Sequence, residues 1–235
     1  MTGHILPTGA GRVVMDKPAN PLHRYTLELT GKERPRVLFI GTASGDDPTY
    51  IVSFYSSYHV DRCLPSHLRL FHISEPDIRA FILKHDVITV GGGNTANMLD
   101  VWRRHGVDSA LREAWEQGAV MTGGSAGGLC WFKGGTTDSF GPAMEVLVDG
   151  LGFLDASFCP HFDAEDQRRP LFNQAILDGV LPAGYAADNE VALHFEGTEY
   201  VGAISSSPKG QALRTYIAED GKITEEPLEV EVLTA

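Results

Sequence analysis

Short continuous apolar runs alternate along the first half of the chain with longer stretches that mix apolar and polar residues. The runs at residues 36–41, 86–90 and 119–121 have the pattern of parallel strands that are covered on both faces. Between them, residues 96–104 and 108–117 are expected to be helical. Strands that alternate with helices at this spacing predict an α/β fold with a doubly wound, mostly parallel sheet flanked by helices.

The remaining elements follow from the same patterns and from glycine and proline punctuation. In the first part of the chain we expect helices at 21–29, 50–60, 75–84 and 126–132, and a strand at 68–73. After residue 140, short apolar runs separated by turns predict antiparallel strands toward the C-terminus, at 146–154, 191–195, 200–204, 213–217 and 228–233, with a helix at about 170–177. We expect a single α/β domain, residues 1–235, on which the loop-rich residues 1–35 pack as an N-terminal extension.

The composition is typical of a soluble globular protein and argues against several classes of partner. Hydrophobic residues make up 43% of the chain, and no apolar run approaches the roughly 18 residues of a membrane span. The formal net charge of −12 argues against nucleic acid and anionic membranes, which bind basic surfaces. The N-terminus has no basic and apolar leader, so we expect a cytoplasmic protein. A homodimer is compatible with the sequence, but no feature specifies one.

The cysteines carry no disulfide or metal signal. Cys63, Cys130 and Cys159 are odd in number and irregularly spaced, and there is no C-x-x-C pair. Cys130 and Cys159 lie in apolar surroundings and are expected to be packing residues. Histidine spacings such as H-E-x-x-H do not occur either, so neither a metal site nor a cofactor is expected.

The most informative stretch is residues 121–131, in which Gly123, Ser125 and Gly127 match the nucleophile-elbow pattern G-x-S-x-G. The pattern stands between an expected strand and an expected helix, which is the context that it needs. Glycines on both sides of Ser125 relieve the crowding of a tight turn and leave the Oγ atom exposed at its tip. The N–H group of Ala126 would face negative charge that develops there. A serine that only caps a glycine-rich turn is the alternative.

A second glycine-rich loop, residues 91–95, ends one expected strand and opens the next helix. Ligands bind at the carboxyl ends of the strands in open α/β sheets, so this loop and Ser125 are expected at one edge. A glycine N–H group there can approach a substrate carbonyl closely, and Gly92 is our choice for the second oxyanion donor. Asn94 and Thr95 are expected to contact the substrate. A nucleotide-binding loop is the alternative, but both the full G-x-G-x-x-G pattern and the P-loop pattern are missing.

His161, within Cys-Pro-His-Phe-Asp at residues 159–163, is the best candidate for a general base among nine histidines. It follows an apolar run and precedes a polar stretch, as expected of a loop that emerges from a buried strand. A neutral imidazole could take the proton of Ser125 and return it to a leaving amine. A structural or surface histidine is the alternative.

The residue that would orient this histidine is left open by spacing alone. Asp138 follows the expected elbow helix, Asp163 lies close to His161 in the sequence, and Asp188 and Glu190 precede a strand. Each of them could equally be a solvated loop carboxylate.

Four segments together resemble the serine peptidases of the dipeptidase E and cyanophycinase group. They are Phe-Ile-Gly-Thr-Ala-Ser at 39–44, Gly-Gly-Gly-Asn-Thr at 91–95, Gly-Gly-Ser-Ala-Gly at 123–127 and Pro-His-Phe-Asp at 160–163. The segments occur in the order of that family, and the similarity covers residues 36–205. The resemblance implies a fold like that of class I glutamine amidotransferases, with serine in place of the elbow cysteine.

The resemblance also implies roles for individual residues. It makes Ser125 the nucleophile and His161 the base, with backbone N–H groups near Gly92 and Ala126 as the oxyanion hole. Asp138 matches the position of the family's third catalytic residue, an aspartate that follows the nucleophile.

A substrate class follows from the same resemblance. Dipeptidase E hydrolyses dipeptides with N-terminal aspartate and binds the aspartate carboxylate through an arginine downstream of the histidine. Arg168 and Arg169 lie in the corresponding region, and a guanidinium group suits a carboxylate. We therefore expect a serine peptidase that hydrolyses small Asp-X peptides through a Ser-His-Asp triad and an acyl-enzyme. The alternatives are a cyanophycinase-like β-aspartyl peptidase, another acyl hydrolase, and a catalytically silent relative that binds an acidic metabolite.

Overall fold

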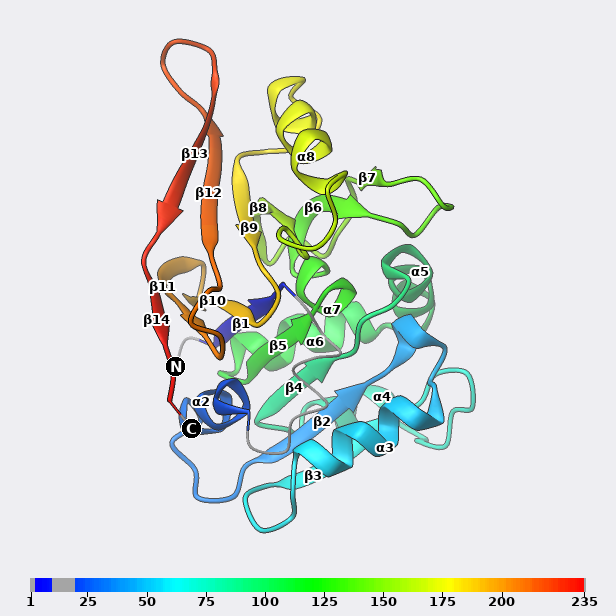
Figure 1. Ribbon diagram of the computed structural model, residues 1–235. Coiled ribbons are helices and arrows are strands. Elements are labelled where there is room, and N and C mark those ends of the chain that lie inside the picture. Colours follow the sequence, from blue (N-terminus) through cyan, green and yellow to red (C-terminus); the bar gives the residue numbers. More distant parts are fainter. Residues whose placement is uncertain (1–2, 10–19, 235) are drawn as a thin grey trace.

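The computed structural model describes residues 3–9 and 20–234, and these residues form two sheets with helices around them (Figure 1). The larger sheet has the strand order β14-β11-β10-β1-β5-β4-β2-β3, and the smaller has the order β13-β12-β9-β8-β6-β7. Neighbouring strands from β1 to β3 in the larger sheet are parallel, whereas β1, β10 and β11 pair antiparallel. The predicted fold class, a mostly parallel α/β sheet with antiparallel strands toward the C-terminus, is confirmed.

The elements have the following bounds. The larger sheet contains β1 (His4–Thr8), β2 (Arg36–Ile40), β3 (Leu64–Leu68), β4 (Val87–Val90), β5 (Val120–Gly124), β10 (Val191–Glu196), β11 (Glu199–Ser205) and β14 (Val230–Val232). The smaller contains β6 (Phe132–Thr137), β7 (Glu145–Leu147), β8 (Leu154–Cys159), β9 (Gly184–Ala187), β12 (Ala212–Ile217) and β13 (Ile223–Leu228). The helices are α2 (Pro21–Glu28), η1 (Thr42–Ser44), α3 (Pro48–Ser57), α4 (Ile78–Ile82), α5 (Thr95–His105), α6 (Val107–Glu116), α7 (Ala126–Leu129) and α8 (Arg168–Leu177).

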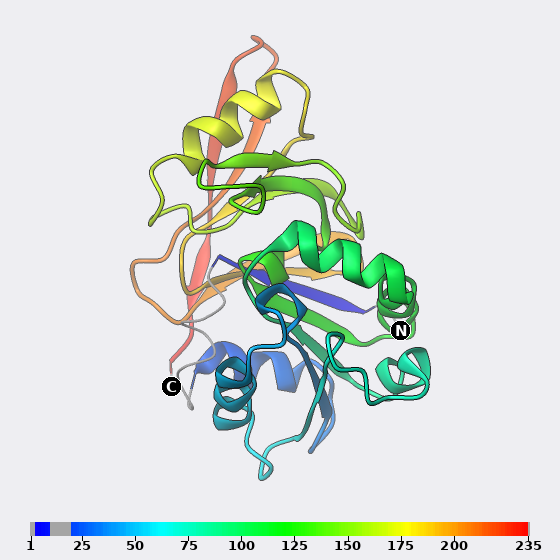
Figure 2. The same ribbon diagram turned by 90° about the vertical axis from the view of Figure 1, so that its right-hand side faces the viewer.

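Helices cover both faces of the larger sheet, and its central strands β2, β4 and β5 are buried at every position except Arg36. Successive side chains of a strand point to opposite faces. In β2, Val37 and Phe39 therefore pack with α2 and α3, whereas Leu38 and Ile40 pack with α4, α5 and α6. Figure 2 shows these two layers of helices on either side of the sheet.

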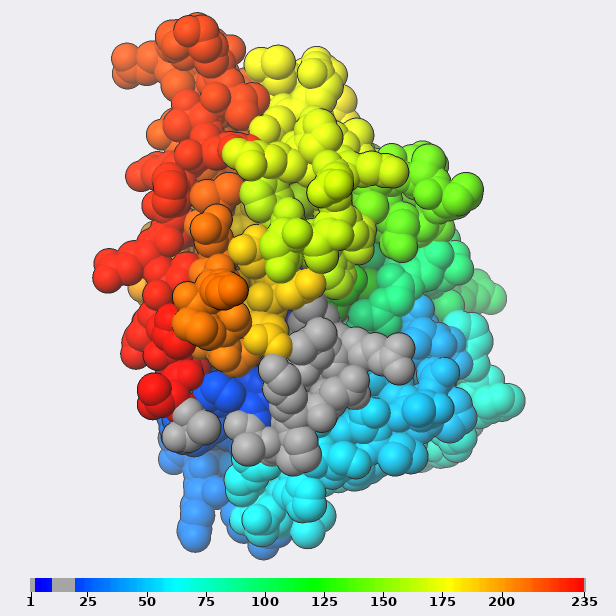
Figure 3. Space-filling model, viewed as in Figure 1, coloured from blue at the N-terminus to red at the C-terminus, as the bar shows by residue number. Residues whose placement is uncertain are grey.

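The smaller sheet lies above the larger one and shares part of its core. Helix α8 covers one face, where Phe172 and Ile176 pack with Cys159. On the other face, Phe132 and Phe158 belong to the same hydrophobic cluster as the side chains beneath α5 and α6. Helix α8 and strands β12 and β13 form the upper part of the molecule (Figure 3). That the chain is a single domain stays a prediction.

Several element boundaries differ from the sequence-based expectation. The strand expected at 68–73 is wrong, since β3 ends at Leu68 and begins at Leu64. The strand expected at 146–154 is two strands, β7 and β8, with turns between them. The helix expected at 126–132 ends at Leu129, and an unexpected strand, β6, begins at Phe132. Strand β9 was also not expected.

The largest difference concerns the N-terminal segment, which we expected to be loop-rich. Residues 4–8 form β1, which lies between β5 and β10 in the middle of the larger sheet. The rest of the expected extension includes residues 10–19, which lie outside the described residues, and α2. Within the part of the chain that the structure describes, no helix is long and apolar enough to cross a membrane.

Candidate active site

Ser125 occupies the tight turn between β5 and α7. Its backbone has φ 55° and ψ −120°, a conformation that residues with a side chain rarely adopt. The turn also passes close to the end of β4: a Cβ atom at Gly127 would lie 2.1 Å from the carbonyl oxygen of Val90, and one at Gly123 would lie 2.6 Å from the same oxygen. The glycines on both sides of Ser125 are therefore required by space.

The end of β1 holds the backbone of both Ser125 and His161. The carbonyl oxygen of Thr8 accepts a hydrogen bond from the N–H group of Ser125 at 3.2 Å. The carbonyl oxygen of Gly9, the next residue, accepts one from the N–H group of His161 at 3.0 Å. The loop that follows β8 and the turn that follows β5 thus meet at the same strand end.

The imidazole ring of His161 is oriented by Asn189. Its Nδ1 lies 2.9 Å from Oδ1 of Asn189. An amide oxygen only accepts hydrogen bonds, so in this arrangement Nδ1 carries the hydrogen and Nε2 has the lone pair that a general base needs. The N–H group of Asn189 in turn donates to Oδ1 of Asp163 at 2.9 Å. Asp163 therefore anchors the backbone that carries Asn189.

Asp138 does not occupy the orienting position that the family resemblance implied. The ring nitrogen that it would contact is hydrogen-bonded to Asn189, and Asp138 is an exposed residue of the loop between β6 and β7. We missed Asn189 in the sequence because we searched for a carboxylate and considered its neighbours Asp188 and Glu190. The sequence signal for this loop was the acidic pair Asp188 and Glu190 before β10. Only the fold shows that the amide of Asn189, between them, contacts the His161 ring.

A polar pocket of about 200 Å³ brings most of the expected site residues together. It is lined by Gly93, Asn94, Ser125, Asp138, His161, Glu165 and Arg168. These residues come from the loop after β4, the turn after β5, the loop after β6, the segment between β8 and α8, and the first residue of α8. The pocket thus contains a hydroxyl group, an imidazole and a guanidinium group within one concave surface.

The two candidate arginines have different environments. Arg168 is 3% exposed, and its Nε donates to Glu165 at 2.8 Å while its Nη1 donates to the carbonyl oxygen of Thr136 at 2.7 Å. Arg169 is not among the residues that line the pocket; its guanidinium group makes two hydrogen bonds to Glu225 and holds the pKa of that carboxyl below its usual value. The expectation that Arg169 contacts the substrate is therefore not supported by the geometry.

Gly92 lies against Ser125, as expected of the loop after β4. A Cβ atom at Gly92 would lie 3.3 Å from Cβ of Ser125 and 3.8 Å from its Oγ. The N–H group of Gly92, however, donates to the Tyr50 hydroxyl at 3.1 Å and is therefore already hydrogen-bonded. Ala126 begins α7, so its N–H group has no acceptor within the helix.

Asn94 and Thr95 hold the loop that carries Asp138. Oδ1 of Asn94 caps α5 by accepting a hydrogen bond from the N–H group of Asn97, and its Nδ2 donates to the carbonyl oxygen of Ser139 at 2.8 Å. Thr95 is buried, and its N–H group donates to Oγ of Ser139 at 2.9 Å. Asn94 lines the pocket, whereas Thr95 does not.

The cysteines are packing residues, as predicted. Cys130 and Cys159 are fully buried, and burial raises the pKa of both thiols, that of Cys159 to about 12. A thiol held neutral in this way is a poor nucleophile. Within residues 3–9 and 20–234, no group of three or more histidine, cysteine or acidic side chains is arranged to hold a metal ion.

Comparisons with known proteins identify the family of this chain. The model of peptidase family S51 matches residues 5–201. The uncharacterized peptidase YgaJ of Bacillus subtilis (strain 168) is 44% identical over 229 residues, which are 97% of this chain and 98% of that protein.

Two solved structures share the fold. A peptidase from an acI-B1 actinobacterium has a TM-score of 0.75 at 16% identity, covering 98% of this chain and 95% of that one. A putative peptidase E protein from Listeria monocytogenes EGD-e has a TM-score of 0.65 at 21% identity, covering 88% of this chain and 100% of that one. The resemblance noted in the sequence is confirmed by the family match: this chain belongs to peptidase family S51, a family of serine peptidases.

Proposed function

We propose that this peptidase cleaves small peptides, with Asp-X dipeptides as its substrate class, and that Ser125, His161 and Asn189 form the catalytic triad. The observation that carries the proposal is the shared pocket in which Ser125, on its strained turn, and His161, oriented by Asn189, both take part. Strained backbone at a serine that lines a pocket is typical of an activated nucleophile.

The geometry supports an acyl-enzyme mechanism. Nε2 of His161 takes the proton of the Ser125 hydroxyl while Oγ attacks the scissile carbonyl carbon, which gives a tetrahedral oxyanion. His161 then gives the proton to the leaving amine as the carbon–nitrogen bond breaks. Water hydrolyses the acyl-enzyme by the same steps in reverse order, with His161 again as the base. Asn189 keeps Nε2 unprotonated at the start of each half-reaction.

Arg168 supports the choice of an acidic side chain at the N-terminal position of the substrate. Its Nε and Nη1 are held by Glu165 and Thr136, which fixes the plane of the guanidinium group beside the pocket. The hydrogen bonds of the described residues leave Nη2 for a ligand. A buried, fixed guanidinium group binds a carboxylate with little further loss of side-chain entropy.

The test is hydrolysis of a dipeptide panel by the native protein and by Ser125→Ala. The panel contains α-Asp-X, β-Asp-X, Glu-X and neutral dipeptides, and product amino acids are quantified. Ser56→Ala, an exposed serine on α3, is the matched control. Thermal unfolding of each variant verifies that the fold is intact.

We expect cleavage of α-Asp-X peptides that Ser125→Ala abolishes and Ser56→Ala leaves unchanged. Equal turnover by folded Ser125→Ala protein would overturn the assignment of the nucleophile. A preference for β-Asp-X would replace the substrate class by that of a cyanophycinase-like enzyme, and a preference for neutral dipeptides would overturn the role of Arg168.

A further inference from the structure

Asp138 lines the same pocket as Ser125 and His161, although Asn189 occupies the orienting position beside the His161 ring. Asp138 is exposed, and no hydrogen bond or ion pair joins its carboxylate to another of the described residues. Every other charged side chain of the pocket has a partner within the protein. The carboxylate of Asp138 is therefore available to a ligand that enters the pocket.

Hydrogen bonds on both sides of Asp138 fix the loop that carries it. Oγ of Ser139 accepts a hydrogen bond from the N–H group of Thr95, at the start of α5, at 2.9 Å. The carbonyl oxygen of Ser139 accepts one from Nδ2 of Asn94 at 2.8 Å. On the other side, Thr137 is buried, and its Oγ1 lies 2.7 Å from Oγ of Ser139. Because this backbone is already ordered, a ligand loses little affinity to ordering of the loop.

The charged side chains that line the pocket are one ion pair and one single carboxylate. Nε of Arg168 lies 2.8 Å from Oε2 of Glu165, so the charges of these two groups offset each other. Asp138 then leaves the pocket with one unbalanced negative charge among the described residues that line it. Such a pocket favours a ligand with a cationic group. In an Asp-X dipeptide with a neutral second residue, the cationic group is the N-terminal ammonium, two bonds from the scissile carbonyl carbon.

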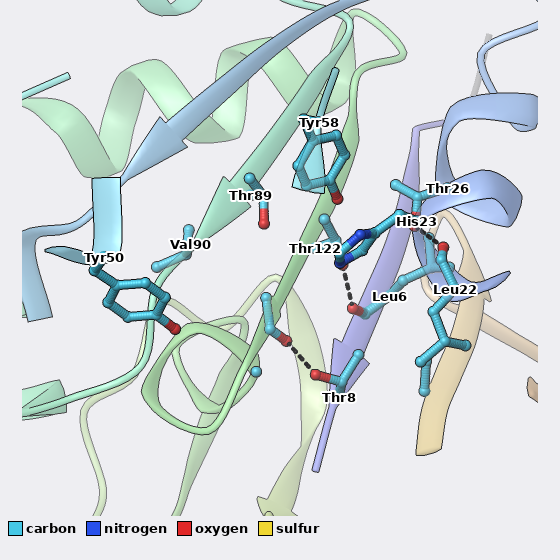
Figure 4. Close-up of a pocket in the computed structure, with 13 residues that line it drawn as sticks. Leu6, Thr8, Leu22, His23, Thr26, Tyr50, Tyr58, Thr89, Val90 and Thr122 are labelled. Carbon is cyan, nitrogen blue, oxygen red and sulfur yellow. Dashed lines mark hydrogen bonds between the residues drawn. The ribbon is translucent and has the colours of Figure 1, made fainter. Parts of the chain in front are cut away.

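A second cavity near the same turn is unsuited to a charged ligand. It is lined by Gly123 and Gly124 of the turn and by polar side chains that include Thr89, Thr122 and His23 (Figure 4). Its volume of about 20 Å³ admits about one water molecule. Burial lowers the pKa of His23 to about 3, so its ring is neutral near pH 7. No carboxylate or guanidinium group is among the described residues that line this cavity, so the charges of the substrate match only the pocket that contains Asp138.

We propose that the carboxylate of Asp138 binds the N-terminal ammonium group of the substrate. This inference rests on the proposed function, in which Arg168 binds the side-chain carboxylate of the same substrate residue. Two opposite charges of the pocket then bind two opposite charges of one aspartyl residue, which fixes the orientation of its carbonyl group before Ser125 attacks. An acetylated N-terminus and an aspartate within a longer chain lack the ammonium group. Peptides of both kinds are therefore poor substrates.

The test compares Asp-Leu with succinyl-Leu, which has the same scissile amide and the same carboxylate but a hydrogen atom in place of the ammonium group. We measure kcat and KM of native protein and of Asp138→Asn for both compounds. We expect Asp138→Asn to lower kcat/KM for Asp-Leu by about 10- to 100-fold. The change should appear mainly in KM, because the contact exists in the ground state and in the transition state. For succinyl-Leu, the same substitution should leave kcat/KM unchanged or raise it.

The two substrates separate failure of this inference from failure of the proposed function. Equal losses for both compounds in Asp138→Asn would show a role that does not depend on the ammonium group, and this result would overturn the inference. Unchanged kcat/KM for Asp-Leu in Asp138→Asn would overturn it as well. Native protein that cleaves neither compound would instead refute the proposed function.

Two other carboxylates serve as controls. Glu165→Gln removes the ion-pair partner of Arg168 and should lower kcat/KM for both compounds alike, because both carry the carboxylate that Arg168 binds. A loss confined to Asp-Leu in Glu165→Gln, without one in Asp138→Asn, would transfer the ammonium site to Glu165. Glu145→Gln changes an exposed carboxylate at the start of β7, outside the pocket, and should change neither value. An equal loss in Glu145→Gln and Asp138→Asn would assign the effect to net charge and refute the contact.

Labelling with a fluorophosphonate provides a measurement that needs no ammonium group, because the reagent phosphonylates an activated serine directly. We expect Ser125 to be labelled at the same rate in native protein and in Asp138→Asn, since Asp138 contacts only the substrate. Labelling that is slower by about tenfold or more in Asp138→Asn would place Asp138 in the catalytic machinery and overturn the inference. Native protein that is not labelled would refute the proposed function. Thermal unfolding of each variant verifies that the fold is intact.

Discussion

Replacement of Asn189 tests the central feature of the site, its hydrogen bond to the His161 ring. Asn189→Ala removes the acceptor of Nδ1–H and leaves the ring free to rotate and to change tautomer. The backbone N–H group that donates to Asp163 is retained, so the loop stays anchored. The expected consequence is a lower kcat with little change in KM, because the substrate contacts lie elsewhere in the pocket.

The size of the loss follows from the neutral character of the amide. A hydrogen bond between uncharged groups contributes about 0.5–1.5 kcal/mol, which corresponds to a reduction of about 2- to 13-fold in kcat. Asn189→Asp places a carboxylate in the same position, and its charge favours the imidazolium form. The acid limb of the profile of kcat/KM against pH then moves to higher pH, by about one to three pH units.

The assay is the pH dependence of dipeptide hydrolysis by native protein, Asn189→Ala, Asn189→Asp and Asp138→Asn. We expect the two Asn189 variants to change kcat or the acid limb as described, and Asp138→Asn to leave the acid limb in place. An unaltered kcat in Asn189→Ala together with an unaltered acid limb in Asn189→Asp would refute the orienting role of Asn189. A displaced acid limb in Asp138→Asn would return that role to Asp138.

Three further predictions concern packing, specificity and pH. Gly127→Ala should lower the free energy of unfolding, measured in urea, by about 3 kcal/mol or more, because its Cβ atom would lie 2.1 Å from a carbonyl oxygen of β4. Gly141→Ala, in open space, should change this free energy by less than about 0.5 kcal/mol. Similar values for both variants would contradict the packing argument. Arg168→Met should lower kcat/KM for Asp-X dipeptides by at least about tenfold and Arg169→Met should not, so the opposite ranking would place Arg169 in the site. Burial lowers the pKa of His23 from 6.5 to about 3, so the unfolded state binds more protons between these pH values and stability falls as pH drops through this window. The free energy of unfolding should change by up to about 1.4 kcal/mol per pH unit there, and this dependence should weaken in His23→Phe. An unchanged dependence in His23→Phe would refute its origin in His23.

The sequence predicts the parallel core of the fold well because apolar runs leave few alternatives. Strands β2, β4 and β5 are buried on both faces, and their continuous apolar sequences have no helical period. The strand expected at 68–73 lies instead at β3, which contains Pro65, a residue that disfavours a strand in a sheet interior. At the edge of the sheet, where β3 lies, a proline is tolerated. A strand can therefore form at Pro65 because of its position at the sheet edge, and the local sequence does not reveal that position.

Strand β6 was missed for a related reason. Its sequence, Phe-Lys-Gly-Gly-Thr-Thr, has two adjacent glycines that favour a turn when they are considered locally. In the structure, a Cβ atom at Gly135 would lie 1.8 Å from the carbonyl oxygen of Phe158 on the neighbouring strand. A Cβ atom at Gly134 would lie 2.1 Å from the carbonyl oxygen of Leu147 on β7. Both glycines are therefore present because neighbouring strands approach closely, and this constraint becomes visible only when β6 is paired with β7 and β8.

The candidate site divides in the same way between local and long-range information. Ser125 was found because its turn has a local pattern, and His161 because it stands at the end of an apolar run. Asn189 has no local signal, since an amide between two acidic residues is common in loops. Its role comes from the contact with His161, which is 28 positions away in the chain.

The end of β1 explains how these distant segments come together. Register places Thr8 opposite Gly124 at the end of β5, and Thr8 and Gly9 then bind the backbones of Ser125 and His161. Consecutive Cα atoms are about 3.8 Å apart, so two neighbouring carbonyl groups at the end of β1 hold the backbones of the proposed nucleophile and base close together. A shift of one residue would turn the side chains of β1 to the wrong faces, which the buried core opposes. A Cβ atom at Gly9 would lie 2.1 Å from the carbonyl oxygen of residue 188, so glycine also admits the loop that carries the orienting amide. Strand β1, which was not expected from the sequence, is therefore the element that sets the geometry of the candidate site.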